Sequence, residues 1–221
     1  MMTGTLYIVS TPIGNLEDIT LRAIRTLKEV DLVAAEDTRR ALVLLKAYGI
    51  EKQVLSYHSH SGRAKSDQII NKLLEGKNIA LVSDSGTPGI SDPGGVLVSA
   101  ALDAGIKVTA APGATGVITA LVISGKPTHK FVFEGFLSNK SARRKKQLEE
   151  LCREERTVVV YESPHRIEKF MQDMASIDPE REVITAREMT KKFEEVRRNT
   201  AAGHLEWFRT NRPRGEFVVV F

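Results

Sequence analysis

The stretch IALVSDSGTPGISDPGG, residues 79–95, indicates how the rest of the chain is organised. Its first four residues form an apolar run typical of a buried parallel strand. The loop that follows holds four glycines, two prolines and two aspartates, and glycine lets a backbone adopt positive φ or come close to a ligand. Open α/β sheets bind ligands at the carboxyl ends of their strands. The stretch therefore predicts a small-molecule site, although an ordinary strand-to-helix connection is the alternative.

Strands and helices alternate on both sides of this loop. Apolar runs at residues 6–10, 31–35, 54–56 and 107–110 are separated by helical patterns, which predicts a parallel sheet with right-handed crossovers. A second set of strands is expected at residues 131–133, 157–162, 183–186 and 216–221, in a sheet of mixed strand direction. The polar segment SGKPTH, residues 124–129, is the expected linker. The fold class is therefore α/β, with two α/β domains at residues 1–124 and 125–221.

The composition excludes several classes of protein. The chain has 221 residues and 42% hydrophobic content, with no long apolar run and no charged-then-apolar leader, so we expect a cytoplasmic protein without a membrane span. Cys152 is the only cysteine and no HExxH spacing occurs, so no metal site is expected. No GxGxxG follows a strand, and Ala120 and Pro127 break the Walker pattern around SGKP. Kinases, NTPases and ordinary NAD enzymes are disfavoured.

The positive charge is concentrated in the second half. Residues 1–124 carry 12 Lys/Arg and 12 Asp/Glu, whereas residues 125–221 carry 20 and 16. This distribution suits a polyanionic partner, although such clusters are also common on solvated faces. The candidate contacts with such a partner, which would be a nucleic acid, are Arg143, Arg144, Lys145, Lys146 and Lys192.

Eight motifs in order carry a resemblance to a known family. They are YIVSTPIGNLEDIT, AEDTRR, SDSGTPGISDPG, PGATGVITAL, FEGFLSN, VVYESPHRI, REMTKKFEE and GEFVVV. Together they resemble the tetrapyrrole methylase superfamily of S-adenosylmethionine enzymes, and more closely its branch that methylates a ribose 2′-hydroxyl in small-subunit ribosomal RNA. The resemblance implies a homodimer with the cofactor in a cleft between two α/β domains. It also implies a target at cytidine 1402 of 16S ribosomal RNA.

The resemblance assigns the cofactor residues by motif. The methionine end and the sulfonium are expected near the first two loops, the polar groups near PGAT, and the adenine near the FEGFLSN and VVYE segments. The residues so assigned are Pro12, Gly14, Asn15, Asp84, Gly86, Thr87, Ile90, Ser91, Asp92, Gly113, Ala114, Thr115, Phe133, Leu137, Tyr161 and Glu162.

Two departures from the wider superfamily favour RNA over tetrapyrroles. Porphyrin and corrin methylases of this superfamily carry a GxGPG-like turn where this chain has TPIGN, and an acidic residue where it has Thr87. Asp84 or Asp92 could replace that carboxylate. Relatives of the ribosomal branch often continue beyond a position equivalent to Phe221, so a shortened chain with weaker RNA binding is one expectation. A porphyrinoid methylase and a non-catalytic cofactor- or RNA-binding module are the alternatives.

Methyl transfer from a sulfonium is an in-line displacement that depends on alignment, and a base or a cation would help a weakly nucleophilic ribose hydroxyl. The candidate catalytic residues are Glu36, Asp37, Arg39 and Lys191, with His58, His60, Arg187, Glu188 and Lys192 as further possibilities. Each has a structural alternative: EDTR could be a helix cap with an ion pair, the histidines loop surface, and the lysines phosphate anchors.

Overall fold

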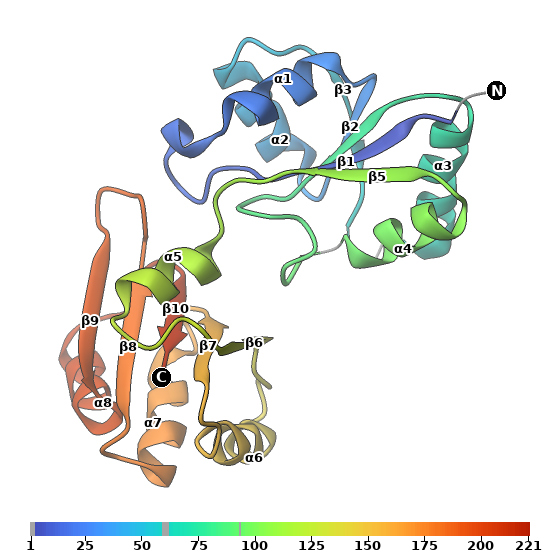
Figure 1. The fold of residues 1–221 in the computed structure, drawn as a ribbon. Helices are drawn as coiled ribbons and strands as arrows, with labels where there is room; N and C mark the ends of the chain where they lie inside the picture. The colour runs from blue at the N-terminus through green and yellow to red at the C-terminus, as the bar shows by residue number, and fades with distance from the viewer. Residues whose placement is uncertain (1–2, 59–61, 93) are drawn as a thin grey trace. The chain divides into compact units, whose positions relative to one another are not determined.

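A computed structural model describes residues 3–58, 62–92 and 94–221, and the chain divides into two compact units, residues 1–115 and 116–221. Each unit contains its own sheet (Figure 1) and is described by itself. The boundary predicted at 124/125 follows helix α5 (Gly116–Ile123), whereas the structural division precedes it. This difference arises because α5 packs on strands of the second unit.

The first unit is a parallel sheet of five strands in the order β3-β2-β4-β1-β5. The predicted parallel sheet is therefore confirmed. Its elements in chain order are β1 (Thr5–Val9), a 3₁₀ turn (Leu16–Asp18), α1 (Leu21–Glu29), β2 (Leu32–Ala35), α2 (Thr38–Ala47), β3 (Gln53–Ser56), α3 (Gly62–Leu74), β4 (Ile79–Val82), α4 (Gly95–Asp103) and β5 (Lys107–Ala111).

Both faces of this sheet are covered by helices, which explains why its central strands are continuous apolar runs. Side chains from alternate positions pack on opposite faces. Val9 and Val82 pack with α1 and α2, whereas Leu6 and Leu81 pack with α3 and α4. β4 is buried at all four positions.

The neighbouring strands β1 and β4 form the topological switch point of the sheet. The connection from β1 passes through α1 to β2, and the connection from β4 passes through α4 to β5 on the opposite face (Figure 1). Open α/β sheets form a ligand crevice where two such connections diverge. The carboxyl ends of β1 and β4 are therefore the place to look for a site in this unit.

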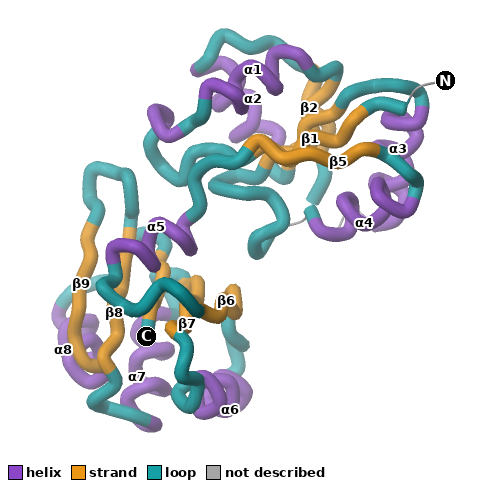
Figure 2. Tube along the Cα trace, viewed as in Figure 1, coloured by secondary structure: helices purple, strands orange, loops and turns teal. Residues whose placement is uncertain are grey.

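The second unit contains a mixed sheet in the order β6-β7-β10-β8-β9. β6 and β7 are parallel and the other pairs are antiparallel, as expected from the sequence. The helices α6, α7 and α8 contribute to one core with β7, β8 and β10, while α5 contacts β7 and β10 (Figure 2). The bounds are β6 (Phe131–Phe136), α6 (Ser141–Leu151), β7 (Thr157–Glu162), α7 (Ile167–Ile177), β8 (Glu182–Arg187), β9 (Glu195–Thr200), α8 (Ala201–Thr210) and β10 (Phe217–Val220).

Two strand boundaries differ from the sequence prediction. β9 was not predicted, because EVRRNT has no apolar run, and its arginines are instead held by ion pairs with Glu182 and Glu195. β6 continues to Phe136 through Gly135, which has φ 61°, and its pairing with β7 shifts register between Phe133 and Phe136. The segment FEGFLSN therefore begins as a strand rather than as a loop.

Two further observations concern the predictions from composition. Cys152 follows α6 and is partly buried, with its Sγ 3.6 Å from Met174 Sδ, as expected of a small apolar side chain. In the residues that the structure describes, no helix is long and apolar enough to cross a membrane.

A buried histidine gives the second unit a pH-dependent stability. His204 of α8 is fully buried, its Nε2 donates to the Val183 carbonyl (2.9 Å), and its buried Nδ1 has no partner. Burial lowers the pKa of His204 below its ordinary value of 6.5. Between the two pKa values His204 is protonated in the unfolded chain but not in the folded chain. The free energy of unfolding is therefore unaffected by His204 above pH 6.5 and decreases as the pH falls from there towards the folded pKa.

We predict that the free energy of unfolding falls by up to about 1.4 kcal/mol per pH unit below that point because of His204. The variant His204→Gln, which keeps a side-chain N–H donor, should lose this part of the slope. Urea unfolding between pH 7.5 and 5 checks this prediction. Equal slopes in the two proteins would contradict it.

Candidate functional site

Three loops of the first unit meet at the carboxyl ends of β1, β4 and β5. They are residues 10–15, 83–92 and 112–115, here called the loop site. A two-residue antiparallel bridge joins the first two loops: the Thr11 amide donates to the Gly86 carbonyl (2.8 Å) and the Gly86 amide donates back to Thr11 (3.2 Å). The Ser10 amide also donates to the carbonyl of Ala111, at the end of β5 (3.1 Å).

Thr87 connects all three loops through one hydroxyl. Its Oγ1 donates to the Ala114 carbonyl (3.2 Å) and shares a hydrogen bond with Ser10 Oγ (2.9 Å). Since a hydroxyl has one proton, Ser10 is the donor in the second bond when Thr87 donates to Ala114. A carboxylate at this position could not donate to Ala114. Thr87 stands out in the sequence as a departure from related enzymes, but its role in joining the loops is visible only in the structure.

The loop site favours glycine at two positions, by a positive φ at one and by close side-chain neighbours at both. Gly86 has φ 82°, and a Cβ there would lie 3.3 Å from Ile13 Cγ2. A Cβ on Gly113 would lie 3.0 Å from the Cβ of Ser10. Ser91 holds a positive φ of 62° without being glycine, a conformation that is sparsely populated and tends to occur at functional sites. The predicted glycine-rich site is therefore a tight backbone structure.

Other predicted residues of the loop site differ in exposure. Pro12 is buried, and Asn15 caps the 3₁₀ turn by accepting from the Glu17 amide (3.1 Å). Ile90 exposes 41% of its surface, and its amide donates to the Thr87 carbonyl. Gly14 and Ser91 are exposed, while Asp92, Ala114 and Thr115 are partly buried. Pro93 lies outside the described residues.

The EDTR segment is tied to the loop site by Asp84. Asp84 Oδ1 accepts from the Asp37 amide (3.1 Å), and Arg40 lies 3.6 Å from its Oδ2. Asp37 caps α2 by accepting from the Arg39 amide (2.9 Å) and pairs with the Arg39 guanidinium (2.8 Å). Hydrogen bonding from Arg39 lowers the pKa of Asp37 to about 2. The cap and ion pair considered from the sequence are both present, and they make Asp37 a weak base.

The second unit holds a cluster of three aromatic rings, here called the aromatic site. Phe133 packs edge-on against Tyr161, with 5.0 Å between the ring centroids, and Phe136 packs at 5.6 Å in a tilted arrangement. Phe136 exposes 54% of its surface. The sequence reasoning named Phe133 and Tyr161 but missed Phe136, because only the register shift in β6 places Phe136 opposite Tyr161. Leu137 beside it is buried.

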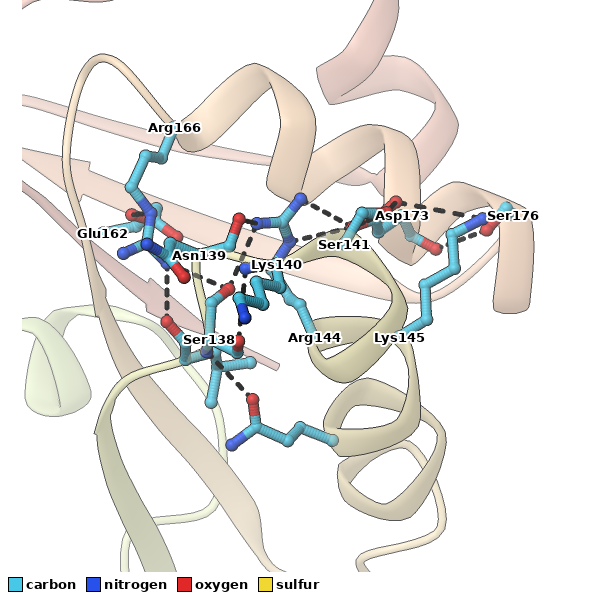
Figure 3. Close-up of polar contacts among 12 residues, drawn as sticks. Ser138, Asn139, Lys140, Ser141, Arg144, Lys145, Glu162, Arg166, Asp173 and Ser176 are labelled. Carbon is cyan, nitrogen blue, oxygen red and sulfur yellow. Dashed lines mark hydrogen bonds and ion pairs between the residues drawn. The ribbon is translucent and has the colours of Figure 1, made fainter.

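Glu162, at the end of β7, is a buried carboxylate with an unsatisfied oxygen. Its Oε1 accepts from the Ser163 amide (2.7 Å) and pairs with Arg166 Nε (3.1 Å), while its Oε2 has no partner (Figure 3). Burial raises the pKa of Glu162. Arg166 in turn donates to the Leu137 carbonyl (2.6 Å). Buried polar atoms nearly always have a partner, so an orphan acceptor suits a ligand that brings a donor.

The basic helix α6 contains one residue that was wrongly assigned to an RNA surface. Arg144 is buried and donates to Asp173 of α7, with Nη2 2.7 Å and Nε 2.8 Å from Oδ2 (Figure 3). Ser141 also donates to Asp173. Arg144 therefore holds α6 to α7 and is not available to a polyanion. Arg143 and Lys146 are exposed, and Lys145 is partly exposed, 3.8 Å from Asp173.

The remaining candidates lie in several places. Lys191 pairs with Glu188 (2.9 Å), and Lys192 lies over the ring of Phe193. Glu36 and His58 are partly buried, and His60 lies outside the described residues. Across residues 3–58, 62–92 and 94–221, no group of three or more His, Cys, Asp or Glu side chains could hold a metal ion.

Comparisons with known proteins place this geometry in a family. Residues 5–203 match the family described as tetrapyrrole (corrin/porphyrin) methylases. The chain belongs to this family. Among solved structures it resembles diphthine synthase (TM-score 0.75, 13% identity, 98% of this chain and 89% of that chain) and the methyltransferase CobJ (TM-score 0.72, 17% identity, 99% and 94%). At such identities the likeness concerns the fold, and it confirms the predicted fold class.

Curated relatives identify the branch. The chain is 50% identical to a protein of Haemophilus influenzae (99% of this chain, 78% of the relative) and 49% identical to one of Synechocystis (98% and 78%). It is 46% identical to one of Thermotoga maritima, with 98% of this chain and 97% of the relative covered. All three are named ribosomal RNA small subunit methyltransferase I. Within the family, the chain belongs to this branch.

The assignment of Arg144 leads to a stability prediction. The variant Arg144→Met leaves the buried Asp173 without its main partner and should destabilise the protein by about 3 kcal/mol. Lys146→Met, two positions along the same helix, removes an exposed charge and should change stability by less than about 0.5 kcal/mol. Urea midpoints of the two variants test this, and similar midpoints would refute the structural role of Arg144.

Proposed function

We propose that the chain is an S-adenosylmethionine-dependent methyltransferase that modifies the ribose 2′-hydroxyl of a cytidine in 16S ribosomal RNA, with cytidine 1402 as the expected target. The observation that carries the proposal is the identity of 46–50% over almost the whole chain to relatives named for small-subunit ribosomal RNA. Thr87 supports it, since the carboxylate expected of tetrapyrrole enzymes is absent there.

The residues present suit S-adenosylmethionine. The cofactor carries hydrogen-bond donors on its ammonium group, its ribose and its adenine, and the adenine is a flat ring. The loop site offers closely spaced main-chain groups. The aromatic site offers ring surface, and Glu162 Oε2 offers a buried acceptor. When bound, the cofactor supplies an electrophilic methyl group.

The protein contributes mainly positioning in this proposal. A displacement at carbon needs the hydroxyl and the methyl group in line, and a rigid site reduces the entropy lost in reaching that alignment. The Thr11–Gly86 bridge and the Thr87 hydroxyl supply that rigidity in the first unit. Asp84 extends it to the start of α2.

The ribose hydroxyl must also lose its proton. Asp37 is poorly suited to accept it because its pKa is about 2. We retain Glu36 as the candidate base, and Arg39 and Lys191 as cations that could stabilise the developing alkoxide. We assign the contacts with RNA phosphates to Arg143, Lys145, Lys146 and Lys192. The assembly of the chain into a homodimer stays a prediction.

Replacement of Thr87 tests the loop site. Thr87→Val keeps the shape but removes the hydroxyl that joins three loops, so we predict about tenfold weaker binding of S-adenosylhomocysteine, or about 1.4 kcal/mol. Thr87→Ser keeps the hydroxyl and should bind within about threefold of the wild type. Calorimetric titration measures both. Equal affinities for the valine variant and the wild type would remove Thr87 from the cofactor site.

The activity itself is tested with small ribosomal subunits that lack the modification. Labelled methyl groups from S-adenosylmethionine should enter one cytidine of the 16S RNA, at its ribose, and alkaline hydrolysis should fail at that position because the 2′-hydroxyl is blocked. Binding should weaken steeply with salt, as it does when phosphates are neutralised by Lys and Arg. Transfer to a porphyrinoid instead of RNA would support the alternative enzyme. Cofactor binding without transfer to either would support a binding module.

A further inference from the structure

The hairpin loop between β8 and β9, residues 188–194, has an unusual backbone. Glu188 has φ 49° and Thr190 has φ 67°. In the part of the chain that the structure describes, Ser91 of the loop site is the only other non-glycine residue with positive φ. Such conformations are sparsely populated and persist only where surrounding contacts impose them.

Several contacts impose this conformation. The Glu188 carboxylate pairs with Lys191 (2.9 Å), and the Lys191 amide donates to the Glu188 carbonyl (3.0 Å). The Glu194 carboxylate accepts from the Thr190 amide, and the Glu194 amide donates to the Lys191 carbonyl (3.1 Å). Both carboxylates of the loop are therefore used within it, and the loop is fixed before any partner arrives.

The fixed loop presents an aromatic side chain to solvent. Phe193 exposes 67% of its surface, more than Phe136 (54%) or Phe131 (36%). Lys192 Nζ lies 5.7 Å from the centroid of the Phe193 ring. A single exposed apolar side chain needs no special explanation, but here the chain holds it on a strained, internally bonded loop next to a cation.

Further cations lie on the neighbouring loop. The segment 211–216 joins α8 to β10 and contacts the β8–β9 loop, because the Glu188 amide donates to the Glu216 carbonyl (3.4 Å). Arg212 and Arg214 of this segment are exposed. Over the described ranges, neither of them nor Lys192 forms an ion pair with a carboxylate. Phe193 is therefore an exposed ring beside one cation, Lys192, on a loop whose neighbouring segment carries Arg212 and Arg214 as well as the exposed Glu216.

We propose that Phe193 stacks on an unpaired nucleobase of the RNA substrate, and that Lys192, Arg212 and Arg214 contact the phosphates beside that base. The inference rests on the proposed function. Proteins that bind single-stranded RNA combine exposed aromatic rings, on which bases stack, with cations that follow the phosphates. A protein partner would be expected to need a wider apolar patch than a single ring with a cation beside it.

The test compares variants of Phe193 in the full chain. Phe193→Ala should weaken binding to unmethylated small ribosomal subunits by about tenfold, the order found when one base loses its stacking partner. Phe193→Leu keeps an apolar side chain without a flat ring and should lose most of that affinity. Phe193→Tyr keeps the ring and should bind within about twofold of the wild type. The affinity for S-adenosylhomocysteine and the thermal midpoint should be the same in all four proteins.

Lys192→Gln provides the electrostatic control. Because one phosphate contact is lost, the magnitude of the slope of log affinity against log salt should fall by about one. Phe193→Ala should leave this slope unchanged. Wild-type affinity in Phe193→Ala, in a preparation whose parent methylates RNA, would overturn the stacking role and leave the function standing. Wild-type affinity in Phe193→Leu alone would show an apolar contact instead of stacking. A wild-type chain that neither binds nor methylates the subunits would refute the proposed function, and with it this inference.

Discussion

The parallel pairing of β1 with β4 is the constraint on which the first unit depends. Because the connections after these strands pass to opposite faces of the sheet, the two loops at the shared carboxyl end meet each other. The Thr11–Gly86 bridge is the direct result. Thr87 then adds the third loop, from β5, through one hydroxyl. Gly86 and Gly113 suit this closeness, because a Cβ at either position would lie within 3.3 Å of a side-chain atom of the first loop.

The second unit is characterised by charged side chains that are buried. Arg144 and Asp173 are both buried and join two helices, while Glu162 is buried at the end of a central strand with one oxygen unsatisfied. The Arg144–Asp173 pair joins two helices and therefore has a structural role. Glu162 has an oxygen without a partner, and this suits a ligand that brings a hydrogen-bond donor. The sequence alone does not tell a structural carboxylate from one that could bind a ligand. The two are distinguished by whether each carboxylate oxygen has a partner in the structure.

Much of the fold could be predicted from the sequence. The apolar runs of β2, β4 and β7 mark strands because each is buried on both faces, and the alternation of strands with helices specifies a parallel sheet in the first unit. β9 could not be found in this way, since its residues are mostly polar, and it is held by its antiparallel pairing with β8, with ion pairs between side chains of the two strands. Phe136 was missed because a register shift in β6 cannot be seen in the pattern of residues.

The candidate site was predictable in place but not in detail. Glycine and proline content located the loops, yet the contact between Thr87 and Ala114 joins residues that are far apart in the sequence. Arg144 stands in a run of four basic residues, and only its spacing of four residues from Leu148, on the buried face of α6, distinguishes it from its neighbours. That spacing was a usable signal.

We propose above all that the three loops joined by Thr87 bind S-adenosylmethionine. Amide hydrogen exchange with and without S-adenosylhomocysteine tests it most directly, because it reports on each backbone segment separately. We expect slower exchange in residues 83–92 and 112–115 when the ligand is bound. Unchanged exchange in both segments at saturating ligand, with protection confined to other parts of the chain, would contradict it.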